Sequence, residues 1–312
     1  MESRLYLEKK TGFYLRRDAD LIPTSIFQPT PEGVTMLCKH YSRKYSIDLR
    51  CVDLRDSVIS GADIKYFFEH LQLNPALIDI AEGESRGLIL SHGQFHVIPL
   101  MIAKKNDIKY MFVFDSSSGS RIKGYFQISN YVSDFQFYLN SGTRQADEGS
   151  CMTDAICILK EALMVPDIIE LIKSKQIAEH TAFKSGRFFT SPKPGNFFLF
   201  KMPERLLLTA QITRYLEQAE ADLSVTLRGG KSLQAYRDDF LLPVVLDSSL
   251  ERAITPINGY LYRKSEEHKS ILDSYSAKLS FDAFDNFEIN QVLPISAEDR
   301  ISMNNSPYPK VV

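Results

Sequence analysis

The 312-residue chain has few cysteines, no apolar run of membrane length and almost no net charge. Four cysteines are too few for a disulfide scaffold, and their spacing is not that of a zinc site, so a reducing compartment is expected. The net charge of −2 gives no global basic field for nucleic acid or an anionic membrane. No apolar run approaches the ~20 residues of a membrane span, and the polar N-terminus differs from a cleavable signal peptide.

Several familiar catalytic motifs are also missing. The sequence contains no His-Glu-x-x-His, Gly-x-Gly-x-x-Gly or Gly-x-Ser-x-Gly, so a zinc peptidase, a dinucleotide-binding enzyme and a serine hydrolase are unsupported. The run Arg228-Gly-Gly-Lys231 lacks the spacing of a phosphate-binding P-loop. We expect neither a bound metal nor a nucleic-acid partner.

Three short stretches contain residues that could form one active site: His96, Asp115, and the run from Gln145 to Cys151. A thiol becomes a useful nucleophile only when a base and a charge stabilise its thiolate. In chain order these residues supply a base, an orienting acid, an oxyanion donor and a nucleophile. Each has an ordinary structural explanation when taken alone, as a strand residue, a turn residue or a small buried side chain. The prediction therefore depends on the ordered set.

A predicted hairpin would bring the first two residues together. Two apolar, strand-length runs, 96–103 and 109–115, flank a polar turn and predict an antiparallel pair. If residue i lies opposite residue 211 − i, His96 falls against Asp115, which could then orient the imidazole. Pro99 favours an edge or a bulge, and a bulge would shift this register.

The cysteine stands at the predicted start of a helix. Residues 151–163 have helical periodicity and precede Pro166, and Ser150 is suited to the N-cap. Cys151 would then lie near the positive end of the helix dipole, which favours a thiolate. Gln145, six residues upstream, can fold back to offer its amide to an oxyanion. The apolar positions of this amphipathic helix are Ala155, Ile158, Leu159, Ala162 and Leu163.

The rest of the chain predicts a mixed α/β core followed by a helical region. Before the cysteine we expect a helix after Pro31 and another at 62–71, with strands at 48–54, 87–90 and 125–128. After Pro166 we expect a helix at 167–177, a basic loop at 183–195, a long amphipathic helix at 203–227 and a third helix at 267–279. The predicted divisions are an N-terminal arm (1–26), a catalytic core (27–165), a helical regulatory or substrate-binding region (166–295) and a disordered tail (296–312).

The ordered set resembles a known clan of cysteine peptidases. A histidine opening a strand, an acid ending the next strand and a glutamine six residues before the cysteine are similar to the ubiquitin-like-protein proteases, whose fold the YopJ-like effector acetyltransferases share. The stretch 44–57, the gap of nineteen residues from His96 to Asp115, and the long region after Cys151 resemble the YopJ-like branch. The resemblance covers about residues 35–165. It implies a mixed sheet flanked by helices, a ubiquitin-like-protease-type core, with an added helical C-terminal region.

The resemblance also implies a reaction. In that reaction Cys151 takes acetyl from acetyl-coenzyme A and passes it to a Ser, Thr or Lys of a host protein. His96 is the base, Asp115 orients it, and Gln145 stabilises the oxyanion. The sequence identifies neither the host target nor an oligomeric state. The protein would be a bacterial effector, delivered by a specialised secretion system into the host cell, where the cytoplasm is the expected location.

The chain departs from the family pattern at three positions, and these keep two alternatives open. The residue after the cysteine is Met152, where the family often has glycine. The acid is Asp115, where the YopJ-like branch often has glutamate. The residue after the histidine is Val97, where an aromatic residue is frequent. The aspartate is typical of the proteases, so a ubiquitin or ubiquitin-like-protein cysteine protease (a deubiquitinase) is the first alternative. Met152 suggests the second, a binding protein that has kept the fold and lost the chemistry.

Inositol hexakisphosphate is the further ligand that the resemblance implies, as an activator bound in the helical region. Arg and Lys recognise phosphate through charge-assisted hydrogen bonds, although scattered basic residues also decorate solvated helix faces. The candidate phosphate ligands are Lys184, Arg187, Lys193, Arg228, Lys231, Arg263, Lys264 and Lys269.

Overall fold

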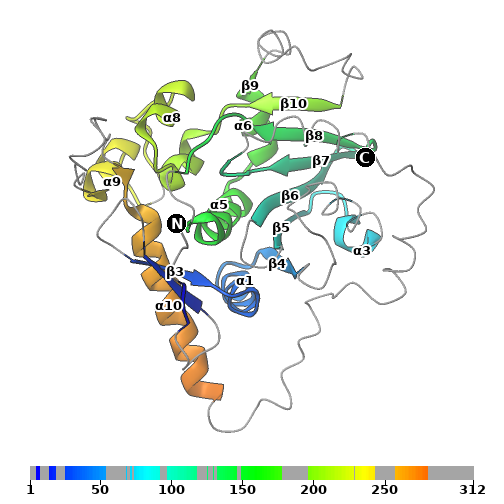
Figure 1. Ribbon diagram of the computed structural model, residues 1–312. Helices are drawn as coiled ribbons and strands as arrows, with labels where there is room; N and C mark the ends of the chain where they lie inside the picture. The colour runs from blue at the N-terminus through cyan, green and yellow to red at the C-terminus, as the bar shows by residue number, and fades with distance from the viewer. Residues whose placement is uncertain are drawn as a thin grey trace, which may run out of the picture.

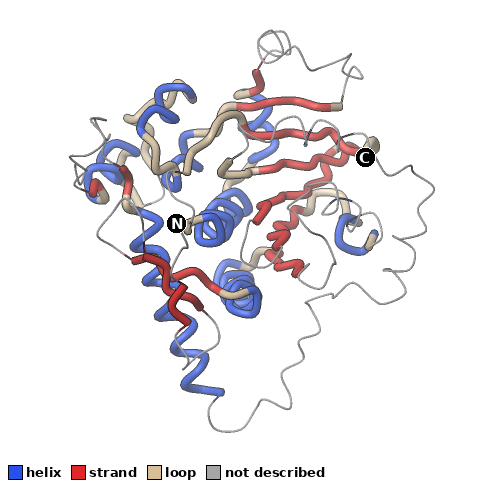
Figure 2. Tube along the Cα trace, in the orientation of Figure 1, coloured by secondary structure: helices blue, strands red, loops and turns tan. Residues whose placement is uncertain are grey.

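The computed structural model contains a layered α/β unit with a smaller N-terminal sheet (Figure 1). In it the helices lie on both sides of one large sheet, and Figure 2 separates the two kinds of element by colour. No helix of the described residues is long and apolar enough to cross a membrane. The structure describes residues 5–7, 14–18, 25–53, 68, 71, 74–91, 97–117, 125, 129, 132–145, 149–177, 196–227, 229–242 and 257–279.

The central sheet has seven strands in the order β4-β5-β6-β7-β8-β10-β9. Strands β4, β5, β7, β8 and β10 run in one direction, and β6 and β9 run in the other, so the predicted mixed sheet is confirmed. The bounds are β4 (Asp48–Asp53), β5 (Ser85–Ser91), β6 (Val97–Lys105), β7 (Ile108–Val113), β8 (Phe135–Asn140), β9 (Gln176–Ile177) and β10 (Phe197–Phe200).

Helices cover both faces of this sheet because successive strand residues point to opposite sides. Met101 and Phe112 belong to the core shared with α1 (Pro31–Tyr45), α5 (Cys151–Met164) and α6 (Ile168–Ser174). Ile102 and Met111 belong to the core on the other face, shared with α3 (Pro75–Ile78). Burial of each such side chain stabilises the fold by roughly 1.5–3 kcal/mol. Both strand faces are apolar, as expected of a sheet covered on two sides.

Helix α1 has clear start and stop signals in the sequence. The Thr30 hydroxyl accepts the Gly33 amide hydrogen at 3.2 Å, Pro31 occupies the first turn, and Ser46 ends the helix in the left-handed conformation with φ 54°. The side chains that this helix turns to the core, Val34, Met36, Leu37 and Tyr41, are all buried.

Helix α5 lies in the middle of the molecule and is buried almost all round, including Asp154 and Lys160. The amphipathic pattern therefore predicted the helix but missed that other elements cover its second side. Gly87 of β5 allows its close approach, because a Cβ there would lie 2.9 Å from Leu49 Cδ1 and 3.0 Å from Leu163 Cδ1. The helix ends just before Pro166, as expected.

The β6–β7 hairpin forms, but its predicted register was wrong by two residues. Lys105 pairs with Ile108, so residue i lies opposite residue 213 − i rather than 211 − i. The cause is the turn, which uses only Asn106 and Asp107, with φ of 53° and 60°, whereas a four-residue turn was predicted. Pro99 causes no bulge, and its carbonyl accepts the Phe114 amide at 2.9 Å.

Two other predictions before the cysteine have different outcomes. Of the predicted strand at 125–128 only Tyr125 is described, and it is helical, while β8 is the strand that precedes the cysteine loop among the described residues. Of the predicted helix at 62–71, only Phe68 and Leu71 are described, and both are helical and buried.

After α5 the predicted long helix at 203–227 was wrong. The segment folds into a 3-10 helix η1 (Glu204–Thr209), an extended stretch and α8 (Thr213–Gln218). The Gln211 amide donates to the Arg144 carbonyl at 2.9 Å, and this long-range pairing replaces helical bonding. The following elements are α9 (Leu233–Asp239), β11 (Leu241–Leu242), β12 (Ile257–Asn258) and α10 (Tyr260–Leu279), which begins earlier than predicted.

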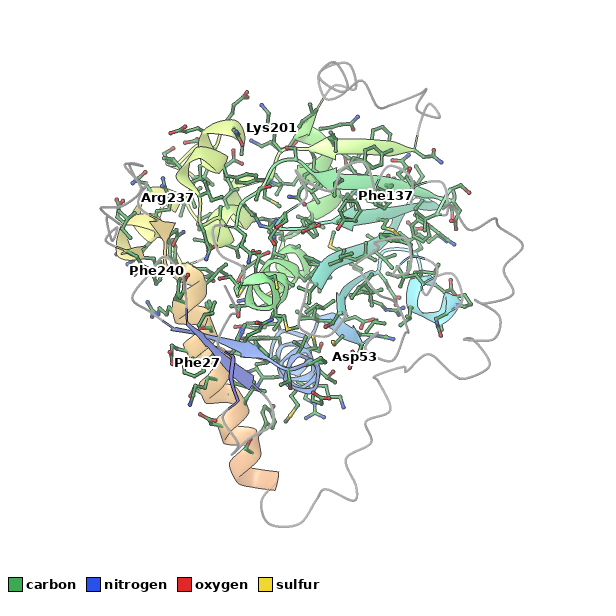
Figure 3. The ribbon with its side chains drawn as sticks, viewed as in Figure 1. Phe27, Asp53, Phe137, Lys201, Arg237 and Phe240 are labelled. Atoms are coloured by element: carbon green, nitrogen blue, oxygen red, sulfur yellow. The ribbon has the colours of Figure 1, made fainter. Side chains whose placement is uncertain are left out.

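The segment predicted as an N-terminal arm contains a small antiparallel sheet that rests on α10. Phe27 lies beside this helix (Figure 3), with its amide donating to Ser265 Oγ at 3.4 Å and Lys269 Nζ 5.3 Å from its ring centroid. The basic loop at 183–195 and the tail at 296–312 lie outside the described residues. The three strands are β1 (Leu5–Leu7), β2 (Tyr14–Asp18) and β3 (Ser25–Pro29).

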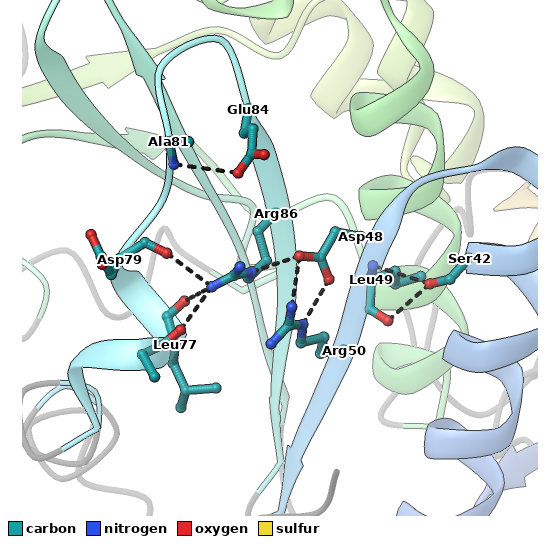
Figure 4. A network of polar contacts seen from close by, with 10 residues as sticks. Ser42, Asp48, Leu49, Arg50, Leu77, Asp79, Ala81, Glu84 and Arg86 are labelled. Carbon is teal, nitrogen blue, oxygen red and sulfur yellow. Dashed lines mark hydrogen bonds and ion pairs between the residues drawn. The ribbon is translucent and has the colours of Figure 1, made fainter.

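An ion-pair network holds the amino-terminal ends of β4 and β5 (Figure 4). Arg86 Nε lies 2.7 Å from Asp48 Oδ2, and Arg86 Nη1 donates to the Leu77 and Asp79 carbonyls at the end of α3. Burial opposes ionisation of Asp48, but Arg50 and Arg86 together hold its pKa below the usual value. This network ties α3 to the sheet at the end opposite to the candidate site.

Candidate active site

Polar residues collect where β4, β5, β7 and β8 end and β6 begins, at a single edge of the sheet. The directions of these strands bring residues distant in sequence to that edge, which is the usual place for ligands in α/β proteins. Asp53 closes β4 (Figure 3), and its register partner Ser91 closes β5. The buried polar residues of this edge are Asp53, Ser91, Asp115, Ser116 and Asn140.

Asp115 is fully buried just beyond β7, and it accepts hydrogen bonds from three of the described residues. The Tyr125 hydroxyl donates to Oδ2 at 2.7 Å, and the Ser117 amide donates to Oδ1 at 2.8 Å. Asn140 Nδ2 donates to the Asp115 carbonyl at 3.1 Å. Each carboxylate oxygen thus accepts a hydrogen bond, which fixes the direction of the carboxylate.

Cys151 is the first residue of α5 and is buried, with 4% of its surface exposed. Ser150 occupies the predicted N-cap position, but its hydroxyl accepts from Gln211 Nε2 at 3.1 Å and does not cap the helix. The Asp154 amide donates to the Ser150 carbonyl at 2.8 Å and closes the first turn. The sulfur thus stands where the helix dipole favours a thiolate.

Gln145 is tied to the turn that carries Asp115. Ser116 Oγ donates to Gln145 Oε1 at 2.5 Å. With the amide oxygen accepting from this hydroxyl, the NH₂ group of Gln145 is the end that could donate to an oxyanion. The geometry therefore suits the predicted oxyanion role.

A buried ion pair lies between Arg144 and Asp154, next to these residues. Arg144 Nη2 donates both to the Asp154 carboxylate and, at 2.7 Å, to the Phe114 carbonyl, and the Arg144 amide donates to the Ser116 carbonyl at 3.0 Å. Burial raises the pKa of Asp154, and the Arg144 charge opposes that rise. Both side chains are almost completely withdrawn from solvent.

The structure thus brings Asp115, Gln145 and Cys151 to one edge of the sheet through these bonds. His96 lies outside the described residues, directly before the first residue of β6, Val97. Its role as base stays a prediction.

Five residues beside the site were missed by the sequence reasoning. Two of them carried a detectable signal, because Arg144 directly precedes the predicted oxyanion glutamine and Asp154 interrupts an apolar helix one turn after the cysteine. A charge in an apolar helix calls for a buried partner. The other three lie in a turn, in a helical segment and at the end of β8, and only the tertiary structure reveals their partners. The five are Ser116, Tyr125, Asn140, Arg144 and Asp154.

The described candidates for phosphate binding have acidic or aromatic partners. Lys231 Nζ lies 2.7 Å from Asp239, Lys264 Nζ 2.5 Å from Glu267 and Lys269 Nζ 2.9 Å from Asp273. The Arg263 guanidinium lies 5.2 Å from the Phe240 ring centroid. The remaining candidates, Lys184, Arg187, Lys193 and Arg228, lie outside the described residues. Within the described part of the chain, no three His, Cys, Asp or Glu side chains form a group that could hold a metal.

Comparison with known proteins identifies relatives in structure and none in sequence. No sequence profile of a known family matches the chain, and no curated protein matches either. A deletion variant of AvrA, solved with IP6 and CoA, matches with a TM-score of 0.50 and 14% identity, covering 77% of this chain and 87% of that one. HopZ1a in complex with IP6 and CoA matches with a TM-score of 0.54 and 8% identity, covering 78% and 85%.

A second HopZ1a structure, in complex with IP6, matches with a TM-score of 0.52 and 8% identity, covering 78% of this chain and 85% of that chain. AvrA and HopZ1a are both effector acetyltransferases of the YopJ family. The chain therefore has the fold of this class, and the resemblance predicted from the sequence is confirmed at the level of the fold.

Proposed function

We propose that this chain is a bacterial effector acetyltransferase that uses Cys151 as nucleophile, acetyl-coenzyme A as donor and a host protein as acceptor. The observation that carries the proposal is the assembly of Asp115, Gln145 and Cys151 at one edge of the sheet, through the Ser116–Gln145 and Arg144–Asp154 contacts. The shared fold supports it, as do the IP6 and CoA present in the structures of AvrA and HopZ1a.

In the first half-reaction the Cys151 sulfur attacks the thioester carbonyl of acetyl-coenzyme A, and His96 receives the thiol proton. Asp115 orients the imidazole and stabilises the imidazolium, which is what its fixed, buried carboxylate is suited to do. The Gln145 amide and the Cys151 backbone N–H donate to the oxyanion. The coenzyme A thiolate then leaves and takes the proton from the imidazolium, which leaves an acetyl thioester on Cys151.

In the second half-reaction a hydroxyl or amine of the host protein attacks this thioester. His96 removes the proton from the attacking Ser, Thr or Lys side chain, and the Cys151 thiolate is the leaving group. The acetyl group is thus transferred twice, first to the Cys151 sulfur and then to the oxygen or nitrogen of the host side chain. Both steps use the same base and the same oxyanion donors. Delivery would be by a specialised secretion system into the host cytoplasm.

Inositol hexakisphosphate is proposed as an activator. The described basic residues suit a ligand with several phosphates, because Arg263, Lys264 and Lys269 lie on a single helix, α10. Their partners Glu267 and Asp273 each keep 40% of the side chain exposed, and exposed ion pairs contribute only about 0–1 kcal/mol. A ligand with several phosphates can therefore displace these carboxylates.

Incubation with radiolabelled acetyl-coenzyme A, with and without inositol hexakisphosphate, tests the proposal. Label should appear on Cys151 or, by self-acetylation, elsewhere on the chain, and the Cys151→Ala variant should lose it while keeping the wild-type circular dichroism spectrum. Cys157→Ala is the matched control, because Cys157 lies on the same helix with 1% exposure and has no proposed role. Label that survives in Cys151→Ala would remove the nucleophile assignment.

A ubiquitin or ubiquitin-like-protein protease is the second candidate, and the aspartate at position 115 favours it. The same residues would then pass the acyl group to water. A ubiquitin activity probe incubated in parallel separates the two, since labelling by the probe without acetylation supports the protease. Labelling in neither assay would favour a binding protein that has lost the chemistry, as Met152 first suggested.

A further inference from the structure

We infer that Arg144 is a positioning residue: its buried guanidinium sets the Asp115 turn, the Gln145 loop and the first turn of the Cys151 helix relative to one another. The inference deepens the proposed function and depends on it for the roles of those three residues. Arg144 is fully withdrawn from solvent, and it is the largest side chain in that state among the described residues.

One guanidinium nitrogen connects two of the three segments. Nη2 donates to the Phe114 carbonyl at 2.7 Å, directly before Asp115 in the chain, and also to the Asp154 carboxylate, one helical turn after Cys151. A planar guanidinium has its donors in fixed directions, so two bonds from the same nitrogen fix the angle between their acceptors. The carbonyl before the acid and the helix of the nucleophile are therefore held by a single rigid group.

The backbone of Arg144 adds the third segment. Its amide donates to the Ser116 carbonyl at 3.0 Å, and its carbonyl accepts from the Gln211 amide at 2.9 Å. Gln211 Nε2 in turn donates to Ser150 Oγ at 3.1 Å, at the residue before Cys151. Gln145 follows directly and bonds to Ser116, so its position depends on the same residue. The bonds of Arg144 to Phe114, Ser116 and Asp154 thus end beside or one helical turn from proposed catalytic residues, and its bond to Gln211 leads on to Ser150.

This arrangement differs from an ion pair that serves only the fold. The Asp48–Arg86 pair also joins two elements with a nitrogen–oxygen distance of 2.7 Å, but it lies at the opposite end of the strands. A pair with a structural role alone should affect stability and leave the reaction unchanged. A positioning pair should affect the reaction when stability is kept, because a misplacement of 1 Å can lower a rate on the order of 10²-fold.

The test replaces both charges by apolar groups of similar size, in Arg144→Met/Asp154→Leu. Buried ion pairs exchanged in this way often leave stability unchanged, whereas removal of one partner does not. We expect the double variant to keep the wild-type near-ultraviolet spectrum and a KM for acetyl-coenzyme A within twofold, while kcat falls by about 10- to 100-fold. Wild-type kcat in the folded double variant would overturn the inference.

A second measurement needs no acetyl donor, namely the rate of alkylation of Cys151 by iodoacetamide as a function of pH. If Arg144 positions the helix against the acid and the base, its loss should move the alkylation profile to higher pH, toward that of an ordinary thiol. An unchanged profile in the folded variant contradicts the inference. Because this readout is independent of acetyl-coenzyme A, it still decides the role of Arg144 if wild-type protein fails to acetylate and the proposed function falls.

Two further variants complete the design. Asp48→Leu/Arg86→Met is the matched control, and it should leave kcat and the alkylation profile unchanged; equal changes in the control would overturn the inference. Arg144→Lys is used if the double variant does not fold, because it keeps the charge but loses the rigid planar group. A lower kcat and a shifted profile in folded Arg144→Lys support the inference, and wild-type values for both overturn it.

Discussion

The Tyr125 hydroxyl donates to Oδ2 of Asp115 over 2.7 Å, and both side chains are fully buried. An ionised carboxylate in such a place is costly unless its oxygens are hydrogen-bonded. The Ser117 amide occupies the other oxygen, so both oxygens have a donor. The tyrosine therefore has two effects, since it compensates the burial of the charge and fixes the direction of the carboxylate.

Tyr125→Phe should lower both stability and activity. A hydrogen bond to a charged group contributes about 1.5–3 kcal/mol, so we expect a loss of that size in the free energy of unfolding, measured with urea. The proposed acetyl transfer should slow more than the KM for acetyl-coenzyme A changes, because the carboxylate then loses its fixed direction.

Tyr275→Phe is the matched control for this experiment. It also removes one hydroxyl, which lies 3.3 Å from His40 Nδ1 between α1 and α10, away from the proposed site. This partner is not a buried charge, so a loss of no more than about 1 kcal/mol and wild-type activity are expected. If both variants slow the reaction equally, the role assigned to Tyr125 is wrong.

The bond between Ser116 and Gln145 predicts a non-additive pair of substitutions. Gln145→Ala should lower kcat on the order of 10²- to 10³-fold if the amide is an oxyanion donor. Ser116→Ala should have a smaller effect on kcat, because it releases the amide but does not remove it. In the double variant the serine substitution should add almost nothing, as expected of residues that act as one unit. Fully additive effects would show that Ser116 does not act through Gln145.

A buried histidine predicts a pH dependence of stability. Burial lowers the pKa of His268 to about 3; Glu267 acts in the opposite direction, and Lys264, Lys160 and His40 lower the pKa further. The unfolded chain takes up this proton near pH 6.5 and the folded protein does not, so stability falls as pH drops below that value. Between pH 7.5 and pH 5 the histidine alone should lower the free energy of unfolding by about 2 kcal/mol.

His268→Phe isolates this contribution. The ring packs edge-on against Tyr41, 5.7 Å between centroids, and neither ring nitrogen hydrogen-bonds to any described residue, so an apolar ring suits the site. Urea unfolding at pH 7.5 and at pH 5 should show a smaller difference in the variant than in the wild type. An equal difference in both proteins would mean that His268 does not titrate on unfolding.

The four cysteines should react unequally with iodoacetamide. Burial raises the pKa of Cys157 to about 12 and that of Cys38 well above its ordinary value, so both remain unreactive thiols at pH 8. Mass spectrometry of the native protein should find the label on Cys151 and not on these two residues. Faster labelling of Cys157 than of Cys151 would contradict the proposed nucleophile.

Sequence patterns predicted those elements whose signals are local. Helix α1 has its cap and proline, α5 has its periodicity and a following proline, and the strands of the hairpin are continuous apolar runs. The register failed because it depends on the conformation of only Asn106 and Asp107, which a count of polar residues does not determine. The long helix failed because Gln211 bonds to Arg144, a partner 67 residues away in sequence.

In the candidate site, too, local signals were predictable from the sequence and long-range contacts were not. The roles of Asp115, Gln145 and Cys151 were predicted from order and spacing and stay predictions, and the Ser116–Gln145 and Arg144–Asp154 contacts join the segments that contain them. Their supporting residues, such as Tyr125 and Asn140, act through contacts between distant segments. Spacing in one sequence carries no information about such contacts.

Strand β10 pairs in parallel with β8, although α5 and α6 lie between them in the chain. During translation, when the chain has emerged only as far as α5, one edge of β8 is therefore unpaired. An unpaired strand edge can pair with other chains. The backbone bonds from Arg144 to Gln211 and from Gln211 to Asn258 also require later segments. These bonds can form only after residue 258 has been synthesised, and recombinant fragments that stop at residue 165 are expected to aggregate.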